Sequence, residues 1–192
     1  MTPVTYLLLL ANLLVFGMEG QLGERFVETY ALWPLGHGFA LVQLVTSAFL
    51  HANPVHLATN MIGLWVFGRE VERGIGSPRF LLLYTASVLS AALAQVAVCT
   101  LMGQVFPTVG ASGGLFGVLA AFAMLYPQRT VILLFPPIPL PARVFVVLYG
   151  LFELYAGVYG TQQGVAHFAH LGGLAGGFFM LRRWRRPRRG GR

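Results

Sequence analysis

The residues best suited to chemistry are a serine set among glycines and two closely spaced histidines. Ser112 lies in the pentapeptide GASGG, where Gly110 permits a tight backbone ahead of the serine. His167 and His170 are three residues apart, so they share a face if this stretch is helical. A serine hydroxyl becomes a nucleophile when a neighbouring base removes its proton, and histidine is the commonest base. The sequence therefore indicates acyl transfer by a Ser–His pair, and spacing alone leaves either histidine as the base.

GASGG also fits G-x-S-x-G, the nucleophile-elbow pattern of α/β-hydrolases. That pattern needs a strand before the serine and an acid between the serine and the histidine. The sequence has no aspartate, and Glu153 is the one acid between Ser112 and His170. Because apolar helical stretches flank the serine, we exclude that fold and are left with a Ser–His pair without an evident third member. Glu153 lies in an apolar stretch and is expected to hydrogen-bond a neighbour.

The composition excludes an ordinary soluble domain. Of 192 residues, 56% are hydrophobic and 10% are charged, whereas a soluble domain is about 25% charged. Seven of the 13 arginines fall within residues 182–192, so the net charge of +7 comes from this tail. Such a terminal run favours a cytoplasmic anchor that contacts anionic lipid and does not indicate nucleic-acid binding. A single cysteine, Cys99, excludes an intrachain disulfide or thiolate metal site, and we expect no metal and no cofactor.

Apolar stretches predict an all-α membrane protein with a polytopic bundle of six transmembrane helices over residues 1–181, followed by a basic cytoplasmic tail. The second helix should continue to about Glu72, which with Arg73 is expected at the membrane interface. Residues 19–53 mix charge with aromatic side chains and are expected to lie in the interface. The expected helices cover residues 4–18, 54–68, 79–102, 111–127, 141–159 and 167–181.

Charge distribution predicts the orientation of this bundle. With the N-terminus inside, all of the 13 arginines except Arg25 lie on the inner side. Each even-numbered helix then starts at the outer face, which gathers the polar residues His56, Asn60, Ser112 and His170 in the outer leaflet. His56 and Asn60 are four residues apart and share a helix face. GxxxG pairs on the fourth and sixth helices favour the close approach that would join Ser112 to a histidine.

Three segments, HANPVHLATN, GASGGLFG and AHFAHLGGLAGG, resemble in this order the rhomboid intramembrane serine proteases. The resemblance covers roughly residues 41–181. It implies that Ser112 is the nucleophile and that His170, in the A-H-x-x-G element, is the base. It also implies that His56 and Asn60 stabilise the oxyanion. The Ser112 backbone N–H at a helix N-terminus would add a donor, with Gly110 permitting the backbone there.

The sequence departs from this family at two places. Val42-Gln43 stands where many bacterial members carry Trp-Arg in the first loop, which bears on how that loop is anchored. Phe116 stands four residues after the nucleophile, where a tyrosine is frequent; it can stack on His170 but has no hydroxyl. We expect His51 to brace the loop or the second helix, and His167 to be structural.

The resemblance implies an intramembrane endopeptidase that hydrolyses a peptide bond in or beside a transmembrane segment of membrane-protein substrates. It would sit in the cell (inner) membrane with both termini cytoplasmic and the active site open to the outer side. Substrate would reach the site between the second and fifth helices, with the loop at residues 160–166 as a lid. Two other functions are weighed: an inactive rhomboid-like scaffold that binds membrane proteins, and a small transporter or proton channel using His56, Glu153 and His170.

Overall fold

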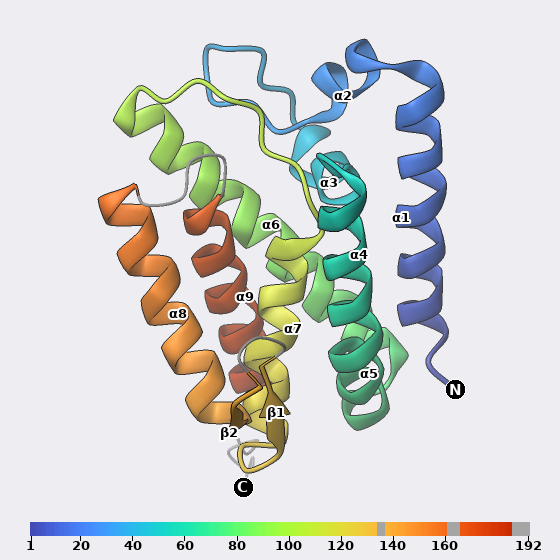
Figure 1. Ribbon diagram of the computed structural model, residues 1–192, viewed down its shortest axis with the longest axis vertical. Coiled ribbons are helices and arrows are strands. Elements are labelled where there is room, and N and C mark those ends of the chain that lie inside the picture. The colour runs from blue at the N-terminus through green and yellow to red at the C-terminus, as the bar shows by residue number, and fades with distance from the viewer. Residues whose placement is uncertain (134–136, 161–165, 186–192) are drawn as a thin grey trace, which may run out of the picture.

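The computed structural model of the protein describes residues 1–133, 137–160 and 166–185, and most of them are helical (Figure 1). A short antiparallel hairpin between α7 and α8 departs from the all-α expectation. The elements are α1 (Pro3–Leu22), α2 (Glu24–Tyr30), α3 (Gln43–Thr46), the 3₁₀ turn η1 (Ser47–Phe49), α4 (Pro54–Gly63), the π-helical turn η2 (Leu64–Gly68), α5 (Arg69–Ile75), α6 (Ser77–Met102), α7 (Ser112–Leu125), β1 (Thr130–Ile132), β2 (Pro139–Pro141), α8 (Ala142–Tyr159) and α9 (His167–Arg185).

Each of the six stretches expected to be helical is helical. Within the described residues, α1, α6 and α8 are long and apolar enough to cross a membrane. The 14 residues of α7 extend about 21 Å, against an apolar bilayer core about 30 Å thick. The structure therefore shows a mostly helical membrane fold with several apolar helices, and the count of six crossings stays a prediction.

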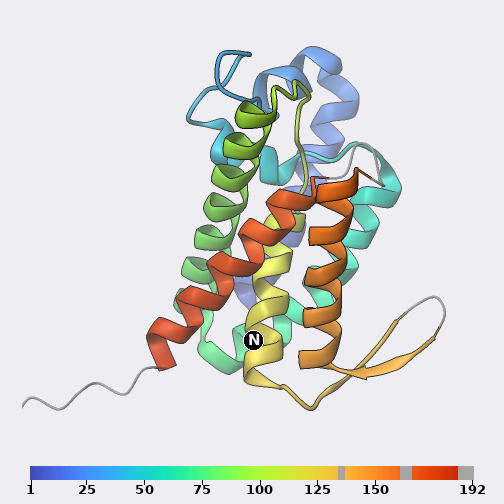
Figure 2. The same cartoon turned by 90° about the vertical axis from the view of Figure 1, so that its left-hand side faces the viewer.

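The short helix α7 is the buried centre of the bundle. It lies against α6 and α9, and nearly all its residues between Gly113 and Ala123 are buried (Figures 1 and 2). Its upper end lies below the upper ends of α4, α6 and α8 (Figure 1). Ser112, the first residue of α7, is therefore held inside the bundle rather than at its rim.

Glycines on α7 and α9 let the two backbones touch. A Cβ atom built on Gly173 would overlap the backbone carbonyl of Gly113, and one built on Gly177 would overlap that of Gly117. No side chain larger than hydrogen fits at Gly173 and Gly177 unless the helices separate. The contact predicted from the two GxxxG pairs is thus confirmed, and it sets the distance between the starts of α7 and α9.

Gln43 anchors the loop between α2 and α3. Its side chain is buried, with 2% of the residue exposed, and it makes four hydrogen bonds to backbone groups of this loop and of the last turn of α2. The amide group therefore ties together a segment that makes no regular secondary structure of its own between α2 and α3. Oε1 accepts from the N–H groups of Trp33 (3.3 Å) and Ala40 (3.1 Å), and Nε2 donates to the carbonyls of Thr29 and Gly38 (both 3.1 Å).

A cap starts the helix that carries His56. The Asn53 side-chain oxygen accepts a hydrogen bond from the His56 N–H at 2.8 Å, and Pro54 opens α4. Both residues are typical of a helix start, because the first-turn N–H groups have no intrahelical partner. α4 then continues through η2 into α5 without a break, so the second expected helix does extend past Glu72.

Glu72, which was expected at the membrane interface, is buried inside the protein. Only 2% of Glu72 is exposed, because its carboxylate binds the first turn of α1. It accepts hydrogen bonds from the Val4 N–H (3.0 Å), from the Thr5 N–H (2.8 Å) and hydroxyl (2.6 Å), and from the Ser77 hydroxyl (2.7 Å). A carboxylate is stabilised at a helix N-terminus, where unpaired N–H groups and the helix dipole meet it. Glu72 therefore joins the starts of α1 and α6.

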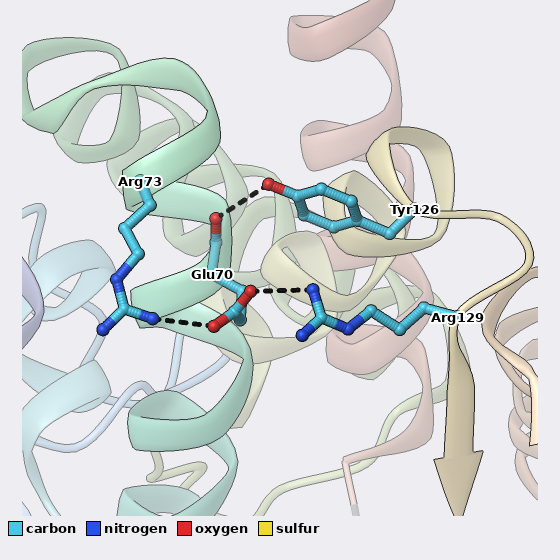
Figure 3. Close-up of polar contacts among 4 residues, drawn as sticks. All are labelled: Glu70, Arg73, Tyr126 and Arg129. Atoms are coloured by element: carbon cyan, nitrogen blue, oxygen red, sulfur yellow. Dashed lines mark hydrogen bonds and ion pairs between the residues drawn. The ribbon is translucent and has the colours of Figure 1, made fainter.

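The neighbouring Glu70 makes a more exposed cluster at the same end of the molecule (Figure 3). Its carboxylate pairs with Arg73 at 2.7 Å and with Arg129 at 3.0 Å, and its carbonyl accepts from the Tyr126 hydroxyl at 3.3 Å. Exposed ion pairs of this kind contribute about 0–1 kcal/mol. The cluster links α5 to the segment after α7 without contributing much to stability.

We expect Gly173→Ala to lower the free energy of unfolding by about 1–3 kcal/mol, because the added methyl group overlaps the Gly113 carbonyl. Thermal unfolding in detergent measures the loss. Gly17→Ala on α1 is the matched control, because a Cβ there meets no atom within 4 Å. Equal melting temperatures for the two variants would contradict the glycine contact.

Gln43→Leu should free the loop between α2 and α3, because it removes four hydrogen bonds, each contributing about 0.5–1.5 kcal/mol at this part-buried position. Limited proteolysis in detergent should cleave the variant within residues 31–42 faster than the wild type. Gln21→Leu, at an exposed position near the end of α1, is the control. Unchanged protection in Gln43→Leu would show that the loop is held by other contacts.

Candidate active site

The first residue of α7 and the fourth residue of α9 meet across the glycine contact. Nε2 of His170 lies 2.8 Å from Oγ of Ser112, which is hydrogen-bond distance. The two residues are 58 positions apart in the chain, and the close approach of their helices is what joins them. An imidazole nitrogen at this distance can remove the hydroxyl proton as a nucleophile forms.

Phe116 fixes the plane of the His170 ring. The two rings are stacked, with centroids 4.2 Å apart and planes 5° apart. Phe116 is buried one turn after Ser112 on α7, so one helix carries both the hydroxyl and the surface on which the imidazole rests. The stacking expected for phenylalanine at this position is observed.

His56 faces the same small space as Ser112, beside Gly110. A Cβ atom built on Gly110 would lie 2.9 Å from Nε2 of His56 and 3.5 Å from Oγ of Ser112. Gly110 has a φ of +132°, which residues with side chains rarely adopt, and a side chain would also fill this space. The backbone N–H of Gly110 donates to the Ser47 carbonyl at 2.9 Å. Gly110 thus leaves the space beside Ser112 free of a side chain and allows the backbone to turn there. Its own N–H is bonded to Ser47 and is not free to bind another group.

Further donors border this space. The Asn60 side chain donates from Nδ2 to the His56 carbonyl at 2.9 Å, and this amide has a second N–H. At the start of α7, the Leu115 N–H bonds back to the Ala111 carbonyl at 3.0 Å, whereas the Ser112 N–H precedes this first turn. N–H groups at this position have no intrahelical acceptor and can bind a negatively charged oxygen.

A cavity of about 470 Å³ opens onto these groups. It lies between α4 and α8, and residues 106–109 of the loop before α7 form part of its wall. Because α7 starts deep in the bundle, the cavity brings this half-buried serine within reach of molecules from outside. Its lining includes His56, Asn60, Ser112, Phe116, Tyr149 and His170.

Glu153 on α8 lies on the far side of His170 from Ser112. Its Oε2 atom is 2.9 Å from Nδ1 of His170 and 2.6 Å from Nδ1 of His167. A neighbour for Glu153 was expected from the sequence, but its identity was not. The signal was present: an acid in an apolar helix needs a partner, and His167 and His170 begin the next helix.

The same three side chains could in principle offer ligands to a metal. One ligand atom from each of Glu153, His167 and His170 lies within 4.8 Å of the others. The contacts of 2.6 and 2.9 Å to a shared oxygen are hydrogen-bond distances, so hydrogen bonding accounts for the arrangement without an ion. The absence of a metal stays a prediction.

His51 packs behind His56 in the loop before α4. It is 3% exposed, its ring centroid lies 5.1 Å from that of His56, and its backbone N–H donates to Glu19 at 3.1 Å. Burial, together with the nearby His56, lowers the pKa of His51 to about 4. His51 is therefore neutral at neutral pH and supports His56 by packing, in line with the bracing role expected.

The chain matches known proteins over the region that contains this site. The Rhomboid domain family model matches residues 38–186. Rhomboid protein 1, mitochondrial, of Saccharomyces cerevisiae is 34% identical over 180 residues, which cover 85% of this chain and 52% of the yeast protein. Rhomboid protease GluP of Bacillus subtilis is 30% identical over 181 residues, covering 91% of this chain and 33% of GluP.

A third relative is similar over an equal length. Rhomboid protease GlpG of Klebsiella pneumoniae is 28% identical over 181 residues, covering 93% of this chain and 62% of GlpG. The chain thus spans about a third to three fifths of the length of these relatives. The family model includes α4, α7 and α9, which carry Ser112, His170, His56 and Asn60. Because this model covers most of the chain, the protein belongs to the rhomboid family.

Proposed function

We propose that this protein is an intramembrane serine endopeptidase that hydrolyses a peptide bond in or beside a transmembrane segment of membrane-protein substrates. The contact of 2.8 Å between Nε2 of His170 and Oγ of Ser112 carries the proposal. The names of the relatives GluP and GlpG, which are rhomboid proteases, support it. No cofactor or metal takes part in the proposed reaction.

The reaction would use Ser112 as the nucleophile. As Oγ attacks the scissile carbonyl carbon, its proton passes to Nε2 of His170, and an oxyanion forms on the carbonyl oxygen. His170 then returns the proton to the leaving amine, which leaves an acyl-enzyme on Ser112. A water molecule admitted through the cavity would hydrolyse this ester by the same steps in reverse order.

The oxyanion would lie in the space beside Gly110. His56 and Asn60 can donate side-chain hydrogen bonds there, and the Ser112 N–H can donate from the start of α7. Gly110 contributes by leaving this space free of a side chain. These donors are in place before reaction, so they stabilise the developing charge without reorganising.

The ends of the helices and the positions of the arginines support an orientation in the membrane. α1 begins and α9 ends at the same end of the bundle, which supports an even number of crossings (Figure 1). Arg73 and Arg129 lie at that end, so the positive-inside rule makes it cytoplasmic and directs the active site outward. We propose six crossings over residues 1–181, a basic cytoplasmic tail at residues 182–192, and a location in the cell membrane.

Substrate access is proposed between α4 and α8, because the cavity lies between these helices and reaches Ser112. An extended segment is required, since a helix hides its carbonyl carbons behind its own hydrogen bonds.

The expected lid covers residues 160–166, most of which lie outside the described residues. Lipid contacts the apolar side chains exposed on α1 and α8.

Ser112→Ala and His170→Ala should each abolish cleavage of a fluorogenic transmembrane-segment substrate in liposomes, because each removes one partner of the proton transfer. A serine-directed phosphonate should label wild type and not Ser112→Ala. His37→Ala, at an exposed loop position, is the control for His170→Ala. Cleavage by Ser112→Ala at the wild-type rate would overturn the assignment of Ser112 as the nucleophile. A folded wild type that neither cleaves nor labels would favour the inactive rhomboid-like scaffold that binds membrane proteins.

Asn60→Ala should lower kcat about 10²–10³-fold, as loss of one oxyanion donor does in other serine proteases. The KM for the same substrate should change little, because the oxyanion exists only during reaction. Steady-state kinetics with a series of substrate concentrations separates the two. A change confined to KM would place Asn60 in substrate binding instead.

A further inference from the structure

His170 uses both ring nitrogens, and they point to different partners. Nε2 lies 2.8 Å from Oγ of Ser112, and Nδ1 lies 2.9 Å from Oε2 of Glu153. A serine, a histidine and an acid are therefore joined in line, from α7 through α9 to α8. The side chains become more buried from His170 to Glu153, since 9% of His170 and 2% of Glu153 are exposed.

This geometry selects one tautomer of His170. A neutral imidazole has a proton on one nitrogen and a lone pair on the other. To accept the proton of Ser112, Nε2 must carry the lone pair, so the proton must sit on Nδ1. An ionised Glu153 accepts hydrogen bonds only, so it stabilises this tautomer and no other.

His167 explains how a carboxylate is tolerated in this apolar place. A buried charge is costly unless hydrogen bonds replace its water. Nδ1 of His167 donates to the same Oε2 atom, at 2.6 Å, so Glu153 receives N–H groups from two histidines. Nε2 of His167 is buried and has no partner among the described residues, which leaves Glu153 as the polar contact of that ring.

We propose that Glu153 is a positioning residue that converts the Ser112–His170 pair into a Ser–His–Glu triad, with His167 holding the carboxylate in place. This proposal rests on the proposed function. During attack the proton of Ser112 moves to Nε2 of His170, while the Nδ1 proton stays on the ring and continues to donate to Glu153. The carboxylate remains ionised, and its charge stabilises the imidazolium until the leaving amine takes the proton.

The test compares wild type with Glu153→Gln in liposomes, using the transmembrane-segment substrate. The amide can donate to Nδ1 and favour the wrong tautomer, and such a change in a serine protease triad lowers kcat about 10⁴-fold. We expect a loss of kcat on the order of 10²–10⁴-fold with KM unchanged within about twofold. Glu70→Gln removes the same charge from α5, where Glu70 pairs with Arg73 and Arg129 and does not line the cavity (Figure 3), and should keep wild-type kinetics.

A second readout reports the proton position itself. Nitrogen NMR of ¹⁵N-histidine-labelled protein distinguishes the two tautomers, and His170→Ala identifies the signals of that ring. Wild type should show His170 protonated at Nδ1, and Glu153→Gln should show protonation at Nε2 or a mixture. If Glu153→Gln does not fold, wild type still decides, because protonation at Nε2 there would overturn the proposal.

The outcomes separate this proposal from the function on which it rests. Active wild type with unchanged kcat and unchanged tautomer in Glu153→Gln would overturn the triad and leave the serine protease intact. Cleavage by Ser112→Ala would overturn the protease, whatever Glu153 does. Loss of kcat together with the tautomer change, and wild-type kinetics in Glu70→Gln, would support the triad.

Discussion

α7 and α9 touch through glycine, and the site depends on that contact. Gly113 and Gly117 on one helix meet Gly173 and Gly177 on the other, with backbone against backbone. In lipid there is little hydrophobic gain in bringing two apolar helices together, so close packing must supply the attraction. The same contact fixes how far Ser112 stands from His170. Stability of the bundle and geometry of the site therefore have one physical cause.

Polar side chains inside the bundle follow a common rule. Each of Gln43, Glu72 and Glu153 is almost fully buried and is held by hydrogen bonds to another loop or helix. Gln43 closes a loop, Glu72 joins the starts of α1 and α6, and Glu153 joins α8 to α9. An unpaired polar group in an apolar interior costs several kcal/mol, so these pairings stabilise the folded chain, and those of Glu72 and Glu153 join different helices.

The shortness of α7 gives the proposed hydrolysis the space that it needs inside a membrane. A helix that crossed the whole bilayer would place its first residue at the surface. By starting lower, α7 leaves room for the cavity between α4 and α8, in which Ser112 would meet both a peptide and water in the proposed reaction. The loop that leads down to Ser112 needs Gly110, because its φ of +132° and the nearby His56 ring exclude a side chain.

The sequence by itself determined the helical class, the positions of the apolar helices to within a few residues, and the rhomboid motifs. Apolar stretches and glycine spacing are local signals, and they can be seen without knowing which helices touch. It also indicated that Ser112 and a histidine would meet, because GxxxG pairs report close helix contact.

Only the tertiary structure decided which partner each buried polar side chain has. Glu153 is 17 positions from His170 and Glu72 is 67 positions from Thr5, and spacing along the chain does not specify these pairings. Glu72 was expected at the membrane interface because it lies near the inner end of the second helix, and the structure adds that the N-terminus of α1 binds its carboxylate inside the protein. The acid behind His170 was missed for the same reason: hydrogen-bond partners across a bundle are set by helix packing, which spacing along one helix does not reveal.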